Sequence, residues 1–166
     1  MKPIYIILSA IIINGCNSTG NIINNAYSNL CSNQPSSMSC IKHEDNGYYQ
    51  SYKQVYDVAI EMYSNFTYET DMSQYGVEEY WFDNEITSIP LKGDCDDISL
   101  TFISQLLING VKPSSIRLVA SGVDGKLKHY YVKVKLDSSK YFDFYKIDKY
   151  TDIMSMQYDN TGVFVK

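Results

Sequence analysis

The stretch that decides the fold is GDCDDISLTFISQLLING, residues 93–110. Asp94 is a favourable N-cap, and Asp96 and Asp97 place negative charge in the first helical turn, where the helix dipole stabilises it. Apolar residues at a spacing of four form a core stripe: Ile98, Phe102 and Leu106. Gly110 ends the pattern as a C-terminal glycine would. The stretch therefore predicts a helix with Cys95 at its N-terminus.

The segments on either side of this helix predict its partners. Upstream, apolar residues spaced by three and four predict another helix over residues 55–66. Downstream, short polar breaks separate three strand-like runs: Ile116–Ser121, Leu127–Leu136 and Tyr141–Ile147. Breaks of this length join antiparallel neighbours. The turn-rich end, 151–162, predicts at most one more short strand, which ends in residues 163–165. Two helices followed by an antiparallel sheet are typical of an α+β fold.

The N-terminus has the pattern of an export signal. Met1-Lys2 precedes an apolar run from Ile4 to Ile13, which is too short to cross a bilayer, since a spanning helix needs about 20 residues. The run ends at Gly15-Cys16, which resembles a lipoprotein processing site, although Asn14 departs from the small residue usual there. We expect a signal peptide over 1–15 and lipidation of Cys16. A buried N-terminal helix or strand is the alternative.

Residues 16–47 are rich in Asn and Ser and show little periodicity, so we expect them to form a lipidated N-terminus and a flexible tether. The folded domain is then expected over 48–166. These features predict a lipoprotein of a bacterial cell envelope that faces the periplasm and contacts the membrane through its lipid. A soluble periplasmic protein is the alternative.

The remaining cysteines follow from this assignment. With lipid on Cys16, three cysteines stay in an oxidising compartment. Cys31 and Cys40 lie nine residues apart and can close a short disulfide, which leaves Cys95 unpaired. Pairing of Cys95 with either of the other two, or simple burial, stays open at this point.

Composition sets the broad class of the protein. A chain of 166 residues favours one domain. The net charge of −5 and the scattered lysines and arginines argue against a nucleic-acid partner, because phosphate binding needs a basic stripe.

Cys95 is also the best candidate for a reactive group. A helix N-terminus lowers the pKa of a thiol, but the flanking carboxylates oppose that effect, so activation requires a base. Of the two histidines, His43 lies in the expected tether and His129 on a predicted strand. Asp143 lies on the next strand, and strand twist or a bulge must bring it to His129. A thiol, an imidazole and a carboxylate are the groups of nucleophilic acyl chemistry, although a single strand histidine is more often structural.

Four segments in order carry a family resemblance: Tyr80-Trp81, Gly93 to Asp97, the strand from His129 to Val132, and Phe142-Asp143. Over roughly residues 50–147 the chain resembles the transglutaminase-like superfamily. It is most similar to the bacterial transglutaminase-like cysteine peptidases, which include periplasmic proteases that release surface adhesins. The resemblance implies a transglutaminase/papain-like cysteine protease fold, with helices packed on an antiparallel sheet.

The resemblance also implies roles for matching residues. Cys95 would be the nucleophile, His129 would take and return its proton, and Asp143 would hold the imidazole tautomer. The indole N–H of Trp81 would help to bind the oxyanion, with core packing as the plain alternative. The adhesin-cleaving relatives resemble calcium-dependent enzymes, which would place Ca²⁺ at Asp94 and Asp96. Helix capping together with the helix dipole explains both acids without a metal, and the chemistry itself requires no cofactor.

The function expected from these features is an exported cysteine peptidase that cleaves a protein or peptide substrate of the envelope or cell surface. A transglutaminase or glutamine deamidase uses the same chemistry and is an alternative. A non-catalytic lipoprotein that binds peptides is the alternative from another class.

Overall fold

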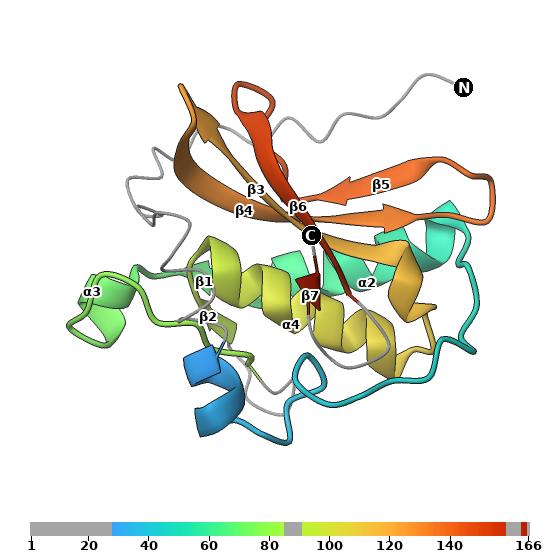
Figure 1. Ribbon diagram of the computed structural model, residues 1–166, viewed down its shortest axis with the longest axis horizontal. Coiled ribbons are helices and arrows are strands. Elements are labelled where there is room, and N and C mark those ends of the chain that lie inside the picture. Colours follow the sequence, from blue (N-terminus) through green and yellow to red (C-terminus); the bar gives the residue numbers. More distant parts are fainter. Residues whose placement is uncertain (1–27, 85–90, 159–163, 166) are drawn as a thin grey trace.

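Helix α4, Cys95–Ile108, is the central helix of the protein, and the sheet lies over it. The computed structural model describes residues 28–84, 91–158 and 164–165 (Figure 1). The remaining elements are α2 (Tyr52–Asn65), β1 (Phe66–Tyr68), α3 (Asp71–Gln74), β2 (Leu91–Gly93), a 3-10 turn (Pro113–Ser115), β3 (Ile116–Val123), β4 (Lys126–Lys135), β5 (Tyr141–Phe144), β6 (Thr151–Tyr158) and β7 (Phe164–Val165). The α+β class predicted from the sequence is confirmed.

Helix α4 begins as the sequence predicts, whereas α2 begins at Tyr52, three residues before the predicted range. The Asp94 side chain accepts from the Asp96 backbone N–H, and the Asp97 carboxylate accepts from the N–H of Asp94, which completes a capping box. In α2, Ser51 and Gln54 form the corresponding box, and one face of the helix is buried. Helix α4 is buried on nearly every side, because the sheet covers it above and α2 packs beside it.

The sheet is antiparallel, with the strand order β5-β4-β3-β6-β7. Its inner face packs on α4, where the rings of Phe102 and Phe144 stack with centroids 4.0 Å apart. Strands β3 and β4 are the long central pair, and a register shift between Ser121 and Gly122 bends their far end. A separate pair, β1 and β2, is parallel and leads directly into the N-terminus of α4.

The eight-residue strand β6 corrects the expectation of a turn-rich C-terminal segment. It pairs with β3, and its side chains from Thr151 to Ile153 are exposed, so it carries little apolar signal. Conversely, β5 ends at Phe144 and not at Ile147, because Tyr145 adopts a positive φ of 67° that breaks the ladder.

Residues 28–47, expected to belong to a flexible tether, pack on the domain. Residues 28–33 are helical, Leu30 is 1% exposed within the core, and Cys31 and Cys40 are joined by a disulfide. Gln34 forms two hydrogen bonds with the backbone of Asp83, at 2.9 and 3.1 Å. The expected signal peptide and the lipidation of Cys16 lie outside the described residues.

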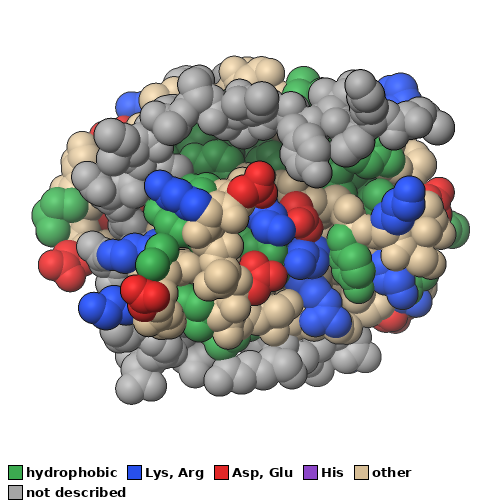
Figure 2. All heavy atoms as spheres, turned by 90° about the horizontal axis from the view of Figure 1, so that it is seen from above, with side chains coloured by type: hydrophobic (Ala, Val, Ile, Leu, Met, Phe, Trp, Pro, Cys, Tyr) green, Lys and Arg blue, Asp and Glu red, His purple; other side chains and the backbone are tan. Residues whose placement is uncertain are grey.

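The outer surface is mixed in charge. Seen from above the sheet (Figure 2), lysine and acidic side chains lie interspersed over the described part of this face. Lys133 pairs with Asp152 at 3.5 Å, and Lys146 with Asp143 at 3.4 Å. Within the described ranges, no helix has the length and apolar character needed to cross a membrane.

Candidate functional site

Cys95 is the first residue of α4 and is fully buried. Its Sγ atom accepts from the backbone N–H of Tyr130 at 3.5 Å and lies 4.0 Å from a carboxylate oxygen of Asp96. The sulfur therefore lies beside the part of β4 that carries His129. Cys95 is disulfide-bonded in this structure, which corrects the expectation of an unpaired residue. A nucleophilic role therefore requires its reduction.

His129 is buried beneath the segment that follows β5. Its Nε2 lies 2.5 Å from the carbonyl oxygen of Tyr145, and its Nδ1 has no hydrogen-bond partner. Burial lowers the pKa of His129 to about 4, although the hydrogen bond to Tyr145 opposes the shift. The neutral imidazole therefore donates from Nε2 and keeps a lone pair on Nδ1, which is the form a general base needs.

The structure does not bring Asp143 to His129. Asp143 lies opposite Lys133 in the β4–β5 ladder, four residues from His129, or about 13 Å along the strand. Its carboxylate pairs with Lys146. No hydrogen bond between the carboxylate and the imidazole occurs among the described residues. The carbonyl of Tyr145 takes the position that the sequence assigns to this side chain.

Trp81 is 3% exposed and packs edge-on against Tyr130, with ring centroids 5.2 Å apart. Its indole N–H donates to the Glu79 carboxylate at 2.7 Å. Trp81 thus packs in the core and lies against the residue whose N–H contacts Cys95 Sγ. Its N–H would have to leave Glu79 to bind an oxyanion.

Buried carboxylates surround the N-terminus of α4. Oxygen atoms of Asp71, Asp94 and Asp97 lie within 4.8 Å of one another, as do ligand atoms of Asp94, Cys95 and Asp96. Burial raises the pKa of Asp71 to about 7, and the neighbouring Asp94 adds to the shift. The pKa values of Asp96 and Asp97 are also raised by burial and by the nearby carboxylates. Burial and mutual repulsion therefore disfavour the ionisation of all these carboxyl groups together.

Sequence reasoning identified Asp94 and Asp96 in this group but not Asp71. Asp71 lies in the four-residue helix α3 and is 1% exposed. One of its oxygens accepts from the backbone N–H of Tyr80, and Oδ1 has no hydrogen-bond partner. The ion pairs of the described residues include none with Asp71, Asp94 or Asp97. Carboxylate oxygens are the ligands that Ca²⁺ prefers, and one of them here, Asp71 Oδ1, has no hydrogen-bond partner, so the group fits a Ca²⁺ ion.

Comparison with known proteins gives one family. The family model for the bacterial transglutaminase-like cysteine proteinase BTLCP matches residues 21–156. The match includes Trp81, the Cys95 helix, His129 and Asp143, and it begins within the segment that was expected to be a tether. No curated protein matches the chain.

Proposed function

This chain belongs to the bacterial transglutaminase-like cysteine proteinase family and is a cysteine-type hydrolase, and we propose that it is exported and cleaves a peptide bond in an envelope or surface protein. The observation that carries the proposal is the position of the Cys95 sulfur, at the N-terminus of α4 and 3.5 Å from the N–H of the residue after His129.

The proposed reaction uses Cys95 as nucleophile and His129 as base. Nδ1 of His129 takes the thiol proton while the sulfur attacks the carbonyl carbon of the scissile bond. The C–N bond then breaks, the proton passes from the imidazole to the leaving amine, and an acyl thioester remains on Cys95. Water adds to the thioester, and the acid product leaves as the thiol is restored. A site that let an amine resolve the thioester would act as a transglutaminase.

Two further residues complete the proposal as the family resemblance assigns them. The family resemblance assigns Asp143 as the third member of the triad, but the proposal gives it no step in the present register, because its carboxylate lies far from His129; it would act only after a change of strand register. Trp81 is the proposed oxyanion donor once its N–H exchanges Glu79 for the substrate. Until then, the Tyr145 carbonyl holds the imidazole tautomer.

Calcium is the proposed cofactor of this site. Asp94 and Asp96 are the ligands expected from the sequence, and Asp71 and Asp97 form a second group of possible ligands with Asp94. A bound cation would offset the negative charge around the thiol and so favour the thiolate.

Lipidation of Cys16 would hold the enzyme near the membrane. Residues 17–27 lie between Cys16 and the first residue that the structure describes, and eleven residues span at most about 40 Å when fully extended. That reach suits a substrate that is itself at the membrane or cell surface.

The direct test is the rate of alkylation of Cys95, followed site by site by mass spectrometry in the reduced chain, across pH and with or without calcium. The proposal expects labelling that slows markedly in His129→Ala and not in the matched control His43→Ala. Hydrolysis of a peptide library that is lost in Cys95→Ser would complete the case. Labelling with an ordinary thiol profile, insensitive to His129→Ala, would support a peptide-binding protein without catalysis.

A further inference from the structure

A pocket lies away from Cys95, between residues 33–38 and the C-terminal half of α4. Its volume is about 480 Å³, within the range of small-molecule sites. Ser104, in its wall, lies nine residues after Cys95, or about 13 Å along the helix axis. The proposed catalytic chemistry therefore makes no use of this pocket.

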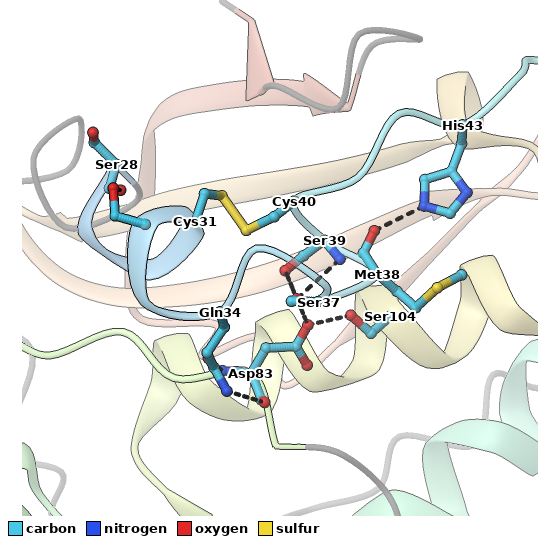
Figure 3. Close-up of a disulfide and its surroundings, with 11 residues drawn as sticks. Ser28, Cys31, Gln34, Ser37, Met38, Ser39, Cys40, His43, Asp83 and Ser104 are labelled. Atoms are coloured by element: carbon cyan, nitrogen blue, oxygen red, sulfur yellow. Dashed lines mark hydrogen bonds between the residues drawn. A yellow bond between two sulfur atoms is a disulfide. The ribbon is translucent and has the colours of Figure 1, made fainter.

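The most unusual group in the wall is Asp83, which is 4% exposed. Three hydroxyls hold its carboxylate, from Ser37, Ser39 and Ser104, and Figure 3 shows them converging on it. All three hydrogen bonds are made to Oδ2, with the Ser39 bond at 2.9 Å. The other carboxylate oxygen receives none of them.

The serines neutralise none of the charge on Asp83. Within the described ranges it forms no ion pair with a lysine or arginine. Burial raises the pKa of this carboxyl, and the hydrogen bonds from the three serines only partly offset the desolvation of its ionised form. Buried charges in proteins are normally paired, so this carboxylate favours a cation from outside the chain.

The rest of the wall specifies what kind of cation fits. Among the described residues that line the pocket, Asp83 is the only one with a formal charge, so these residues offer an anionic ligand no countercharge. The side-chain amides of Asn33 and Gln105 line it and hydrogen-bond to no other described residue. Apolar groups complete the lining: Pro35, Met38 and Ile108. A ligand with a cationic group at the end of an apolar chain matches this lining.

The pocket is also held in shape before any ligand arrives. The Cys31–Cys40 disulfide closes the segment that carries Asn33, Pro35 and Met38. The opposite wall is the buried helix α4. A preformed wall reduces the ordering that binding would otherwise require.

We propose that this pocket binds a primary ammonium group on an alkyl stem, with the Asp83 carboxylate as its counter-ion. A lysine side chain of a protein and a free alkyl diamine present the same chemistry. This site goes beyond the proposed peptidase function and does not depend on it.

Calorimetric titration of the full chain tests the proposal with 1,5-diaminopentane, an Nα-acetyl-lysine amide and the neutral analogue 1-pentanol. Saturable binding of an ammonium probe, with a Kd of about 1 mM or tighter, and none of 1-pentanol is the expected result. Asp83→Asn should weaken it about tenfold or more, because a charge-assisted hydrogen bond is lost. Asp57→Asn, which removes an exposed carboxylate paired with Lys53, is the matched control and should bind normally.

Ile108→Trp gives an independent check, because this side chain is 57% exposed and can obstruct the pocket without disturbing the core. It should also weaken binding. Binding of the lysine derivative alone would identify a protein side chain as the ligand, and binding of the diamine alone a free amine. Absence of binding to the native chain, or equal binding to Asp83→Asn, would overturn the proposal.

Discussion

Removal of the Cys31–Cys40 disulfide should destabilise the whole domain, because the segment that it closes is packed in the folded state. The perturbation is the double substitution Cys31→Ser and Cys40→Ser. The two residues are nine apart. For a loop of that length, the lost restraint on the unfolded chain amounts to about 2.6 kcal/mol at 25 °C.

The chain-entropy estimate applies because the folded state does not depend on the disulfide for its geometry. Leu30 lies in the core and the Asp83 network holds Ser37 and Ser39, so the folded state keeps its geometry without the sulfur bridge. The loss should therefore appear mainly as a more disordered unfolded state. For a domain of this size, it corresponds to a fall in Tm of about 8 °C.

Urea unfolding of the double variant and the native chain, both without reductant, measures the difference in the free energy of unfolding. Ser39→Ala, with the disulfide intact, is a companion variant that removes one hydrogen bond to the buried carboxylate. If 31–40 belonged to a flexible tether, the disulfide would close a loop that is disordered in both states. A difference below about 0.5 kcal/mol would therefore refute the packed arrangement.

Three more predictions concern the site. Asp143→Asn should lower kcat/KM less than tenfold, because its carboxylate pairs with Lys146; a loss near 10⁴-fold would show that it orients the imidazole in the active enzyme. In the folded protein the pKa of His129 is about 4, below its unfolded value of 6.5, so its contribution to stability is present above pH 6.5 and is lost as pH falls through 4. In a series of urea-unfolding measurements across pH, His129→Gln should therefore reduce the change in the free energy of unfolding over this range by about 3 kcal/mol. Since burial raises the pKa of Asp71 to about 7, Asp71→Asn should raise the Tm of the calcium-free protein above pH 7, where the native carboxyl is charged, and should reduce the rise in Tm on adding calcium; an unchanged calcium response would place the metal elsewhere.

Much of the site's framework could be predicted from the sequence because its signals are local. The capping box and continuous apolar content of residues 94–108 specify α4 without reference to the rest of the chain. The break at 137–139 predicts the β4–β5 hairpin, and Leu136 N–H does donate to the carbonyl of Lys140. That pairing already implies an offset between Asp143 and His129, which the register confirms.

What the sequence could not show depends on distant contacts. Leu30 is a single apolar residue in a polar segment, and only its packing identifies residues 28–47 as part of the domain. Asp71 joins the carboxylates of α4 through the parallel β1–β2 pair, 23 residues before Asp94 in the chain. The Tyr145 carbonyl reaches His129 because φ at Tyr145 is positive, a backbone state that its residue type does not predict.

Burial disfavours a charged imidazole beside Cys95. With Cys95 in a disulfide, burial lowers the pKa of His129 to about 4, so the imidazole is uncharged at neutral pH. A thiolate at Cys95 would shift this pKa in the opposite direction. Asp94 and Asp96 on either side of Cys95 oppose the helix dipole, which alone would favour the thiolate. Removal of the thiol proton during attack, or compensation of the carboxylates by a cation, resolves the conflict. The alkylation profile distinguishes these routes, because only the second depends on calcium.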